Sequence, residues 1–224
     1  MNDEGIVVLV PALNAGRSLP MLVSALRLHL ALEQILVVDD GSSDETPEVL
    51  AAAGVMSQRH PVTRGKGAAL RTGFEWWRAR GGWRALVTMD ADLQHRPEDL
   101  STFVERWKRG GCDIVAGKRG RLGTGMPLTR VLSNTITSAL VSARCSSPLV
   151  DTQCGYRLLS REVVEAVRFD SNGFEAETEI LIRALLMGFT VESVGVRTVY
   201  GNEESHMTPW HTTKQFIDVL FRDY

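Results

Sequence analysis

Several absences narrow the classes of protein to which this 224-residue chain can belong. It has three cysteines, Cys112, Cys145 and Cys154, and no CxxC pair, which is typical of a reducing compartment and excludes a disulfide scaffold. No run of about 18 apolar residues occurs, so no membrane-spanning helix is predicted. The first residues lack the basic and apolar regions of a secretory signal. We therefore expect a cytoplasmic protein that would contact a membrane only peripherally, at its cytoplasmic face.

Net charge and the commonest phosphate-binding motifs are also lacking. Basic residues number 25 and acidic residues 27, and a net charge of −2 argues against a general nucleic-acid binder. The segment Gly65-Lys66-Gly67 lacks the upstream glycine and the following Ser/Thr of a Walker motif. No GxGxxG follows the first predicted strand, which argues against a dinucleotide-dependent oxidoreductase. Lys66 is interpreted either as a phosphate ligand at a helix N-terminus or as a solvated basic residue.

What remains is an ordinary globular composition, 44% hydrophobic and 23% charged, with a length that fits one α/β domain. Over the first two-thirds, short apolar runs alternate with helical patterns, which predicts a parallel sheet with crossover helices. The predicted strands cover 6–10, 35–38, 54–57, 85–89, 113–116 and 190–199. The predicted helices cover 19–30, 46–53, 67–80, 97–108, 128–143, 161–167, 175–187 and 214–221. Residues 118–127 are rich in Gly and Arg and are predicted to form a functional loop.

Polar residues gather where the predicted strands end. Pro11 is expected to stop the first strand and to open the segment Pro11–Asn14, Asp39-Asp40 ends the second, and Asp90–Gln94 follows the fourth. An isolated acid at such a place is usually a turn former or a helix cap. Because ligands bind at the carboxyl ends of the strands in open parallel sheets, three clusters on one edge predict a site.

The segment Asp90–Gln94 has the composition of a divalent-cation site. Asp90, Asp92 and Gln94 lie two residues apart, so in extended backbone their side chains would share one face. Two carboxylates and an amide oxygen suit Mg²⁺ or Mn²⁺ and suit zinc poorly. Such ions usually keep waters and bridge to phosphate oxygens. The pattern therefore predicts a cation that holds a diphosphate.

Together, several blocks resemble the signature of family 2 inverting glycosyltransferases of the GT-A fold. The chain is most similar to the dolichyl-phosphate mannose synthase and polyprenyl-phosphate glycosyltransferase branch. The blocks are residues 8–14, 37–44 and 89–94, with further matches at 64–71, 116–119, 151–157 and 174–179. The resemblance implies an α/β, Rossmann-like GT-A fold with a mostly parallel central sheet flanked by helices. We expect a single domain over 1–224, with a nucleotide-sugar half of about 1–117 and an acceptor half of about 118–224.

The resemblance also implies roles for individual residues. Asp40 would address the nucleotide base, and Asp92 and Gln94 would hold the cation on the diphosphate. The residues expected to bind the nucleotide sugar are Pro11, Ala12, Asn14, Asp40, Lys66, Asp90, Ala91 and Arg119. The expected metal ligands are Asp90, Asp92 and Gln94, and the expected acceptor-phosphate ligands are Lys118, Arg119 and Arg130. The expected catalytic residues are Asp92, Glu177 and Arg119. The sequence departs from the commoner family pattern at Leu13, Ala15 and Glu177.

The acceptor decides how these residues would act. An alcohol acceptor needs a general base, and Glu177 would be that base. A lipid phosphate does not, because its second pKa near 6 leaves it anionic at neutral pH; it needs cationic groups instead. With a phosphate acceptor, Glu177 would instead orient the sugar hydroxyls or the acceptor loop. A further interpretation is that Glu177 and Glu179 are simply acids that the helix dipole favours in the first turn of a helix. Four cationic residues favour a polyprenyl phosphate: Lys118, Arg119, Arg121 and Arg130. The alternatives are a hydroxyl of a soluble or glycan acceptor, a nucleotide-sugar-binding module without turnover and a nucleotidyltransferase.

Three further features have two interpretations each, and Cys154 has one. Asp151 is expected either to hold Arg157 or a backbone turn, or to contact substrate, and Cys154 is expected to be a small packed residue. His206 is interpreted as a surface residue or as a diphosphate ligand. In the last helix an apolar stripe is expected to pack on its own domain or to face a bilayer; it consists of Phe216, Ile217, Leu220 and Phe221.

Overall fold

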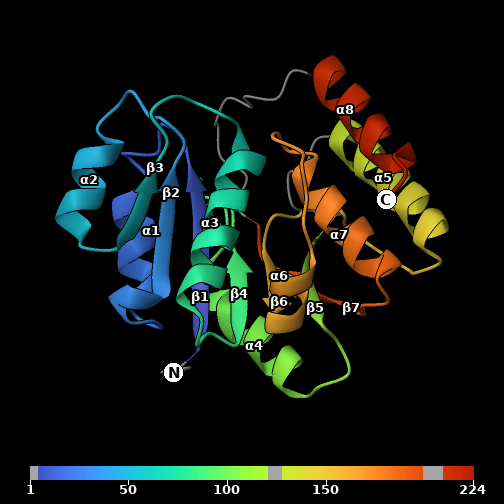
Figure 1. The fold of residues 1–224 in the computed structure, drawn as a ribbon, viewed down its shortest axis with the longest axis horizontal. Helices are drawn as coiled ribbons and strands as arrows, with labels where there is room; N and C mark the ends of the chain where they lie inside the picture. Colours follow the sequence, from blue (N-terminus) through green and yellow to red (C-terminus); the bar gives the residue numbers. More distant parts are fainter. Residues whose placement is uncertain (1–4, 121–127, 199–208) are drawn as a thin grey trace.

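The structure is a computed structural model that describes residues 5–120, 128–198 and 209–224. In these residues a seven-stranded sheet with the order β3-β2-β1-β4-β6-β5-β7 carries helices on both faces (Figure 1). The strands are β1 (Ile6–Ala12), β2 (Ile35–Asp39), β3 (Met56–Arg59), β4 (Ala85–Thr88), β5 (Ile114–Arg119), β6 (Arg157–Ser160) and β7 (Val191–Val196). The helices are α1 (Leu19–Leu26), α2 (Thr46–Ala53), α3 (Lys66–Arg80), α4 (Leu100–Lys108), α5 (Leu128–Cys145), α6 (Arg161–Ala166), α7 (Ala176–Leu186) and α8 (Pro209–Phe221). The predicted single α/β domain is confirmed.

The strand order places the candidate site beside β1. The chain runs outward from β1 to β2 and β3 and then returns to pair β4 with the other side of β1, all in parallel. Ligands of open α/β sheets bind at the carboxyl ends of the strands where the strand order reverses in this way. β6 runs antiparallel between β4 and β5 and begins at this same edge, because Arg157 is paired with Thr88. β6 was not predicted from the sequence, since four residues are too few to show a period.

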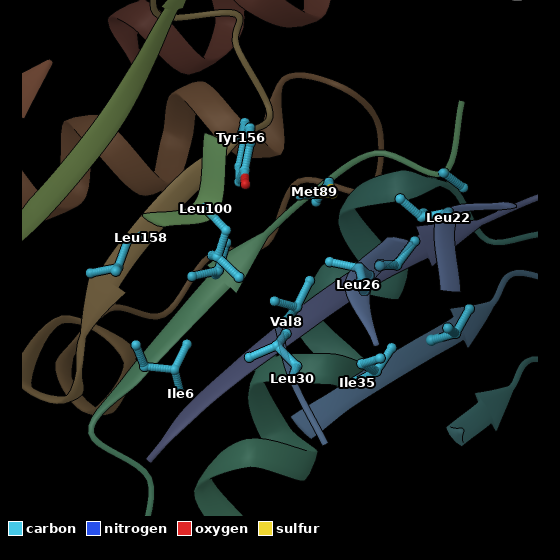
Figure 2. Close-up of a cluster of buried hydrophobic side chains, with 14 of the residues drawn as sticks. Ile6, Val8, Leu22, Leu26, Leu30, Ile35, Met89, Leu100, Tyr156 and Leu158 are labelled. Atoms are coloured by element: carbon cyan, nitrogen blue, oxygen red, sulfur yellow. The ribbon is translucent and has the colours of Figure 1, made fainter. Parts of the chain in front are cut away.

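Burial on both faces of the sheet explains why its central strand is wholly apolar. Val8 and Val10 of β1 pack against α1 on one face, in the cluster shown in Figure 2. Val7 and Leu9 face the other way and pack against Phe74 and the rest of the α3 stripe. A strand covered on both faces loses the alternation of an ordinary surface strand. Burying each such side chain stabilises the fold by about 1.5–3 kcal/mol.

Pro11 does not end the first strand, which corrects the sequence-based expectation. β1 continues to Ala12, and Pro11 is aligned with Val38 of β2. The carbonyl of Leu9 accepts the Met89 N–H on the β4 side, so Pro11, two residues further on, has its nitrogen on that side too. Because β4 ends at Thr88, the missing proline N–H removes no ladder hydrogen bond.

Other predicted boundaries shift for local reasons. α1 ends at Leu26 and not at residue 30, and the helix predicted from Pro97 starts as a 3₁₀ turn before α4. The third strand begins at Met56, because Gly54 (φ 66°) ends α2 in a left-handed conformation. β5 continues through Arg119 by pairing with β7, so the first two residues of the predicted loop are strand. Residues 121–127 of that loop lie outside the described ranges.

The last three long helices form a small core of their own at one edge of the sheet. α5 and α8 lie side by side there, with α7 between them and the sheet (Figure 1). The residues that pack together are Val141, Ile182, Phe216, Val219 and Leu220. The predicted apolar stripe of the last helix is therefore divided: Phe216 and Leu220 are buried, whereas Ile217 and Phe221 are exposed. No helix in the described part of the chain is long and apolar enough to cross a membrane.

Candidate active site

The loops that follow β1 and β2 are joined by Asn14. Its backbone N–H donates to Ser42 Oγ at 2.8 Å, and its side-chain oxygen accepts the Ser43 N–H at 2.9 Å. Asn14 adopts a left-handed conformation (φ 52°), which asparagine tolerates better than most residues. Pro11 and Ala12 are buried in β1 just before this loop. The first two predicted clusters therefore meet at one edge, as expected.

The Asp40 carboxylate is buried and hydrogen-bonded to other groups of the protein. Its carboxylate lies 2.6 Å from His60 Nδ1 and accepts the backbone N–H groups of Arg64 and Gly65, the latter at 2.7 Å. His60 in turn lies 2.9 Å from Thr72 Oγ1. Asp40 therefore fixes the turn before α3, whereas the resemblance placed it at the nucleotide base. His60 was not singled out from the sequence, and the turn was noted only as part of the matching block 64–71.

The glycines on either side of Lys66 allow close contact between two backbones. Gly65 has φ 101°, and a Cβ there would collide with the carbonyl of Asn172. The N–H of Gly67 donates to that same carbonyl at 2.7 Å. The glycine pattern is thus explained by packing of the α3 N-terminus on residues 171–172 and not by a Walker-type loop.

Lys66 joins two carboxylates from distant parts of the chain. Its Nζ lies 2.5 Å from Asp90 Oδ1 and 2.8 Å from Glu177 Oε1. Burial alone would lower the pKa of Lys66, but the two carboxylates raise it above its ordinary value. Likewise burial would raise the pKa of Asp90, and the Lys66 ammonium nevertheless holds it below its ordinary value. The interpretation of Lys66 as a solvated surface residue is wrong.

Gly155 packs closely against the carboxylates of Asp90 and Glu177. A Cβ on Gly155 would lie 2.6 Å from Glu177 Oε1 and 2.9 Å from Asp90 Oδ2. The Gly155 carbonyl accepts a hydrogen bond from Thr88 Oγ1 at 2.7 Å, which fixes it beside the end of β4. A side chain at this position would displace the two acids.

The segment Asp90–Gln94 is a turn and not an extended strand end, which corrects the expected shared face. Leu93 has φ 60°, and Asp92 Oδ1 accepts the Gln94 N–H at 3.0 Å. Ala91 is buried in the core, whereas Asp90, Asp92 and Gln94 are partly exposed. Their carboxylate and amide oxygens fit Mg²⁺ or Mn²⁺. Within 5–120, 128–198 and 209–224 no three His, Cys, Asp or Glu side chains gather as a metal site, so a cation here would need oxygens from the diphosphate as well.

Asp151 holds Arg119, which corrects the expectation that it holds Arg157. Arg119 donates to Asp151 in a bidentate contact, Nε at 2.8 Å and Nη2 at 3.0 Å, and Asn134 donates at 2.9 Å. Burial would raise the pKa of Asp151, but the bonds from Arg119 hold it below its ordinary value. The expected turn is present as well, because Asp151 also accepts the Gln153 N–H.

The structure describes only some of the other residues predicted to bind phosphate. Lys118, next to Arg119 on β5, is exposed. The side chain of Arg130 lies outside the described part of the structure. Arg121 and His206 fall wholly outside the described residues. Of the predicted acceptor-phosphate ligands, the structure therefore describes the side chains of Lys118 and Arg119 alone.

Arg157, which the sequence did not mark as functional, ties the 151–156 loop to the start of α7. It is buried, and its guanidinium donates to the carbonyls of Thr152 (2.8 Å), Cys154 (2.9 Å) and Glu177. Cys154 is wholly buried, and burial raises the pKa of its thiol to about 12, so the prediction of a packed, unreactive residue is confirmed.

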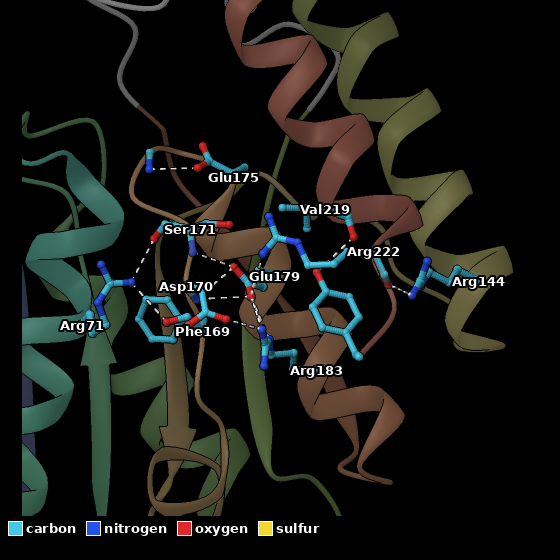
Figure 3. A network of polar contacts seen from close by, with 12 residues as sticks. Arg71, Arg144, Phe169, Asp170, Ser171, Glu175, Glu179, Arg183, Val219 and Arg222 are labelled. Atoms are coloured by element: carbon cyan, nitrogen blue, oxygen red, sulfur yellow. Dashed lines mark hydrogen bonds and ion pairs between the residues drawn. The ribbon is translucent and has the colours of Figure 1, made fainter.

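A second buried acid, Glu179, connects the C-terminal residues to the loop that supports Lys66 (Figure 3). Its carboxylate accepts the Ser171 N–H at 2.9 Å and pairs with Arg183 at 2.7 Å and Arg222 at 3.4 Å. Both Glu177 and Glu179 lie in the first turn of α7, as predicted. Their specific partners show that the helix dipole is not the whole reason for their placement.

The sequence is similar to a known family and to several of its named proteins. A profile of the family described as glycosyl transferase family 2 matches residues 7–168. Polyprenol monophosphomannose synthase from Mycolicibacterium smegmatis is 33% identical over 204 residues, covering 85% of this chain and 76% of that protein. UDP-N-acetylglucosamine–dolichyl-phosphate N-acetylglucosaminyltransferase from Methanococcus voltae is 26% identical over 222 residues, covering 89% and 88%.

A solved structure shows the same fold. Glucosyl-3-phosphoglycerate synthase from Mycobacterium tuberculosis, in complex with Mn²⁺, uridine diphosphate and phosphoglyceric acid, is similar with a TM-score of 0.74 at 22% identity, covering 97% of this chain and 78% of that one. The profile match includes all three strand-end clusters of the candidate site. The chain therefore belongs to glycosyl transferase family 2 and is a glycosyltransferase with the GT-A fold.

Proposed function

We propose that this glycosyltransferase moves one hexose, with inversion, from a nucleotide-diphosphate sugar to a polyprenyl phosphate, and that it requires Mg²⁺ or Mn²⁺. The observation that carries this proposal is the ion pair between Glu177 and Lys66. A general base must be within hydrogen-bond reach of the proton it takes. The carboxylate that an alcohol acceptor would need is instead engaged by an ammonium group. A phosphate acceptor needs no such base.

On the donor side, the loops after β1, β2 and β4 would form the nucleotide-sugar site. Asp90, Asp92 and Gln94 would hold the divalent cation, which neutralises charge on the diphosphate when bound. Lys66 adds a fixed positive charge beside Asp90. The residues proposed to line the nucleotide sugar are Pro11, Ala12, Asn14, Asp40, Lys66, Asp90, Ala91 and Arg119. Asp40 would act there through the Arg64–Gly65 turn that it fixes.

The reaction itself exchanges one bond at the anomeric carbon for another. The bond from that carbon to the diphosphate oxygen breaks, and the nucleoside diphosphate leaves with the electron pair. An oxygen of the acceptor phosphate attacks from the opposite face, which inverts the configuration. Because that oxygen is already anionic at neutral pH, no proton has to be removed.

On the acceptor side, cationic residues would receive the phosphate. Lys118 is exposed on β5, and the Asp151 carboxylate holds the Arg119 guanidinium in place. Arg130 is proposed as a third ligand from its position in the sequence. Relatives of this chain carry names that specify polyprenol or dolichyl phosphate, which supports the same acceptor class.

A panel of GDP- and UDP-sugars, each offered with a short-chain polyprenyl phosphate, tests the proposal. We expect one donor to give a hexosyl-phospholipid product and free nucleoside diphosphate with Mn²⁺ present, and neither product in EDTA. Nucleotide-sugar binding without release of nucleoside diphosphate would identify a binding module instead. Product formation that EDTA leaves unchanged would contradict the metal requirement.

Glu177→Gln separates the two acceptor classes. For a phosphate acceptor we expect turnover to fall by less than about tenfold, because the residue orients groups and removes no proton. Loss of a general base would lower turnover by about 10²–10⁴-fold and would point to an alcohol. Glu162→Gln is a matched control, since Glu162 is an exposed acid in the first turn of α6.

A further inference from the structure

Glu179 of α7 is an acid with no exposed surface. Its carboxylate accepts the backbone N–H groups of Asp170 at 3.3 Å and Ser171 at 2.9 Å. It also pairs with Arg183 at 2.7 Å and Arg222 at 3.4 Å (Figure 3). Burial would raise the pKa of Glu179, but the hydrogen bonds from residues 170 and 171 hold it below its ordinary value. A buried ion pair is weak evidence for stability, because removing the charges from water offsets their attraction. The contacts of Glu179 point instead to a role in positioning.

Glu177 and Glu179 leave the first turn of α7 in opposite directions. Each helical residue is turned by about 100° from the one before it, so two positions apart give about 200°. Glu177 Oε1 lies 2.8 Å from the Nζ of Lys66. Glu179 reaches the other way, to residues 169–173, which we call the support loop. One helical turn therefore contacts Lys66 through one acid and the support loop through the other.

The support loop in turn holds the start of α3. The Asn172 carbonyl accepts the N–H groups of Gly67 at 2.7 Å and Ala68 at 3.4 Å, the two residues that follow Lys66. A Cβ on Gly67 would collide with the Ser171 carbonyl, so the two backbones are in close contact. A shift of the support loop would therefore carry Lys66 with it.

Arg71 holds the support loop from the side of α3. Its guanidinium donates to the carbonyls of Phe169 at 3.1 Å and Ser171 at 3.4 Å (Figure 3). It also donates to the side-chain oxygen of Asn172. The support loop is thus fixed between two helices, by Arg71 on α3 and by Glu179 on α7.

We propose that Glu179 is a positioning residue for sugar transfer, which acts on Lys66 through the support loop. It would set where the Lys66 ammonium lies relative to Asp90 and Glu177, the two carboxylates that this ammonium joins. This role rests on the proposed function in one respect, that Lys66 faces the diphosphate of the donor. A displacement of about 1 Å in such a group can lower the rate by about a hundredfold.

A double-mutant cycle between Glu179 and Lys66 tests this role. Glu179→Gln keeps the size of the side chain and one acceptor oxygen, and should lower kcat by about tenfold without changing KM for the acceptor. Lys66→Met removes the group that is positioned and should lower kcat by about a hundredfold. In the Lys66→Met background, Glu179→Gln should cost less than about twofold, because effects transmitted through one group are not additive. A loss of about tenfold in both backgrounds would overturn the positioning role.

Arg71→Met and Arg78→Met give a matched comparison that leaves the buried acid in place. Arg78 lies about two turns further along α3 and donates to the carbonyls of Val164 and Val167, each at 2.7 Å. Both variants lose an arginine that ties α3 to backbone carbonyls, so their melting temperatures should fall by similar amounts. Only Arg71→Met should lower kcat, by about tenfold, because only Arg71 holds the support loop. Equal kcat values for the two variants would overturn the role.

The choice of acceptor separates this role from the proposed function. Each variant is assayed by release of nucleoside diphosphate, with a short-chain polyprenyl phosphate and with a soluble hydroxyl acceptor. Transfer only to the hydroxyl would overturn the proposed acceptor, and non-additive losses in that reaction would still support the role of Glu179. Additive losses with polyprenyl phosphate would keep the proposed function and overturn the role of Glu179. Wild-type kcat in Lys66→Met would overturn both the placement of Lys66 at the diphosphate and the role of Glu179.

Discussion

The two halves of this enzyme position their polar groups in different ways. At the carboxyl ends of β1, β2 and β4, loops are held largely by backbone hydrogen bonds to a few side chains, as Asp40 does for the Arg64–Gly65 turn. In the half built from β5 to α8, two buried acids are held by arginine side chains, Asp151 by Arg119 and Glu179 by Arg183. The first edge therefore depends on an acid that fixes backbone N–H groups, and the second half on acids that fix arginine side chains.

The apolar surfaces differ in the same sense. The sheet buries its apolar side chains under helices on both faces, whereas α5 buries Val141 but exposes Leu132, Ile136 and Leu140. A contiguous exposed apolar face of this kind marks an interaction surface. Variants in each half, and at the contact between them, test this difference.

Asp92→Asn, in the turn after β4, should give the largest effect on catalysis. It removes one charge from the proposed cation ligands, so kcat with Mn²⁺ should fall by at least about a hundredfold. The melting temperature should change little, because Asp92 is partly exposed. Nucleoside diphosphate release measures the rate, and Asp218→Asn, an exposed acid on α8, is the control. Activity within threefold of wild type would remove Asp92 from the site.

Gly155→Ala tests the contact between the two halves. The added Cβ must displace the Asp90 and Glu177 carboxylates, so turnover should fall by about 10- to 100-fold while the fold is retained. Gly195→Ala is the matched control, because a Cβ there meets nothing within 4 Å. If both variants were fully active, the close packing of the two acids would not matter for the reaction.

Arg157→Met should mainly affect stability. The substitution leaves three buried carbonyls without their charged donor, and we expect the free energy of unfolding to fall by about 3 kcal/mol. Urea denaturation measures the change. Arg80→Met, an exposed arginine stacked on Trp76, should cost about 0.5 kcal/mol. Similar losses in the two variants would show that Arg157 does not hold the 151–156 loop to α7.

Asp151→Asn should give a smaller effect that depends on pH. The pKa of Asp151 is lowered in the folded state, so in acid the unfolded chain takes up the proton first, and the stability supplied by the charge is lost as pH falls through the folded pKa. The variant should therefore be less stable by about 2 kcal/mol at pH 7. This difference should narrow below the ordinary pKa of 3.8. Denaturation curves from pH 7 to pH 3 measure it; a difference independent of pH would contradict the charged pair.

The contrast between the halves also decides what could be predicted from the sequence. The strand-end clusters were found because apolar runs and the polar residues after them are local signals. Lys66 was noticed, but its two partners lie 24 and 111 positions away, and no spacing rule joins them. Arg157 was assigned the wrong partner and Asn134 gave no signal, since the role of a buried arginine or asparagine is recognised only from the carbonyls or carboxylate it contacts. That Pro11 lies inside β1 could not be predicted, because it depends on where the neighbouring strand β4 ends, and strand pairing is a property of the tertiary structure.

The identity of the acceptor tests the central claim most directly. Mass spectrometry of reactions that contain the preferred nucleotide sugar, with either a short-chain polyprenyl phosphate or the matching free polyprenol, identifies the atom that accepts the sugar. We predict a hexose linked through phosphate in the first reaction and no glycolipid in the second. Glycosylation of the free polyprenol, or transfer only to a soluble hydroxyl acceptor, would contradict the proposed function.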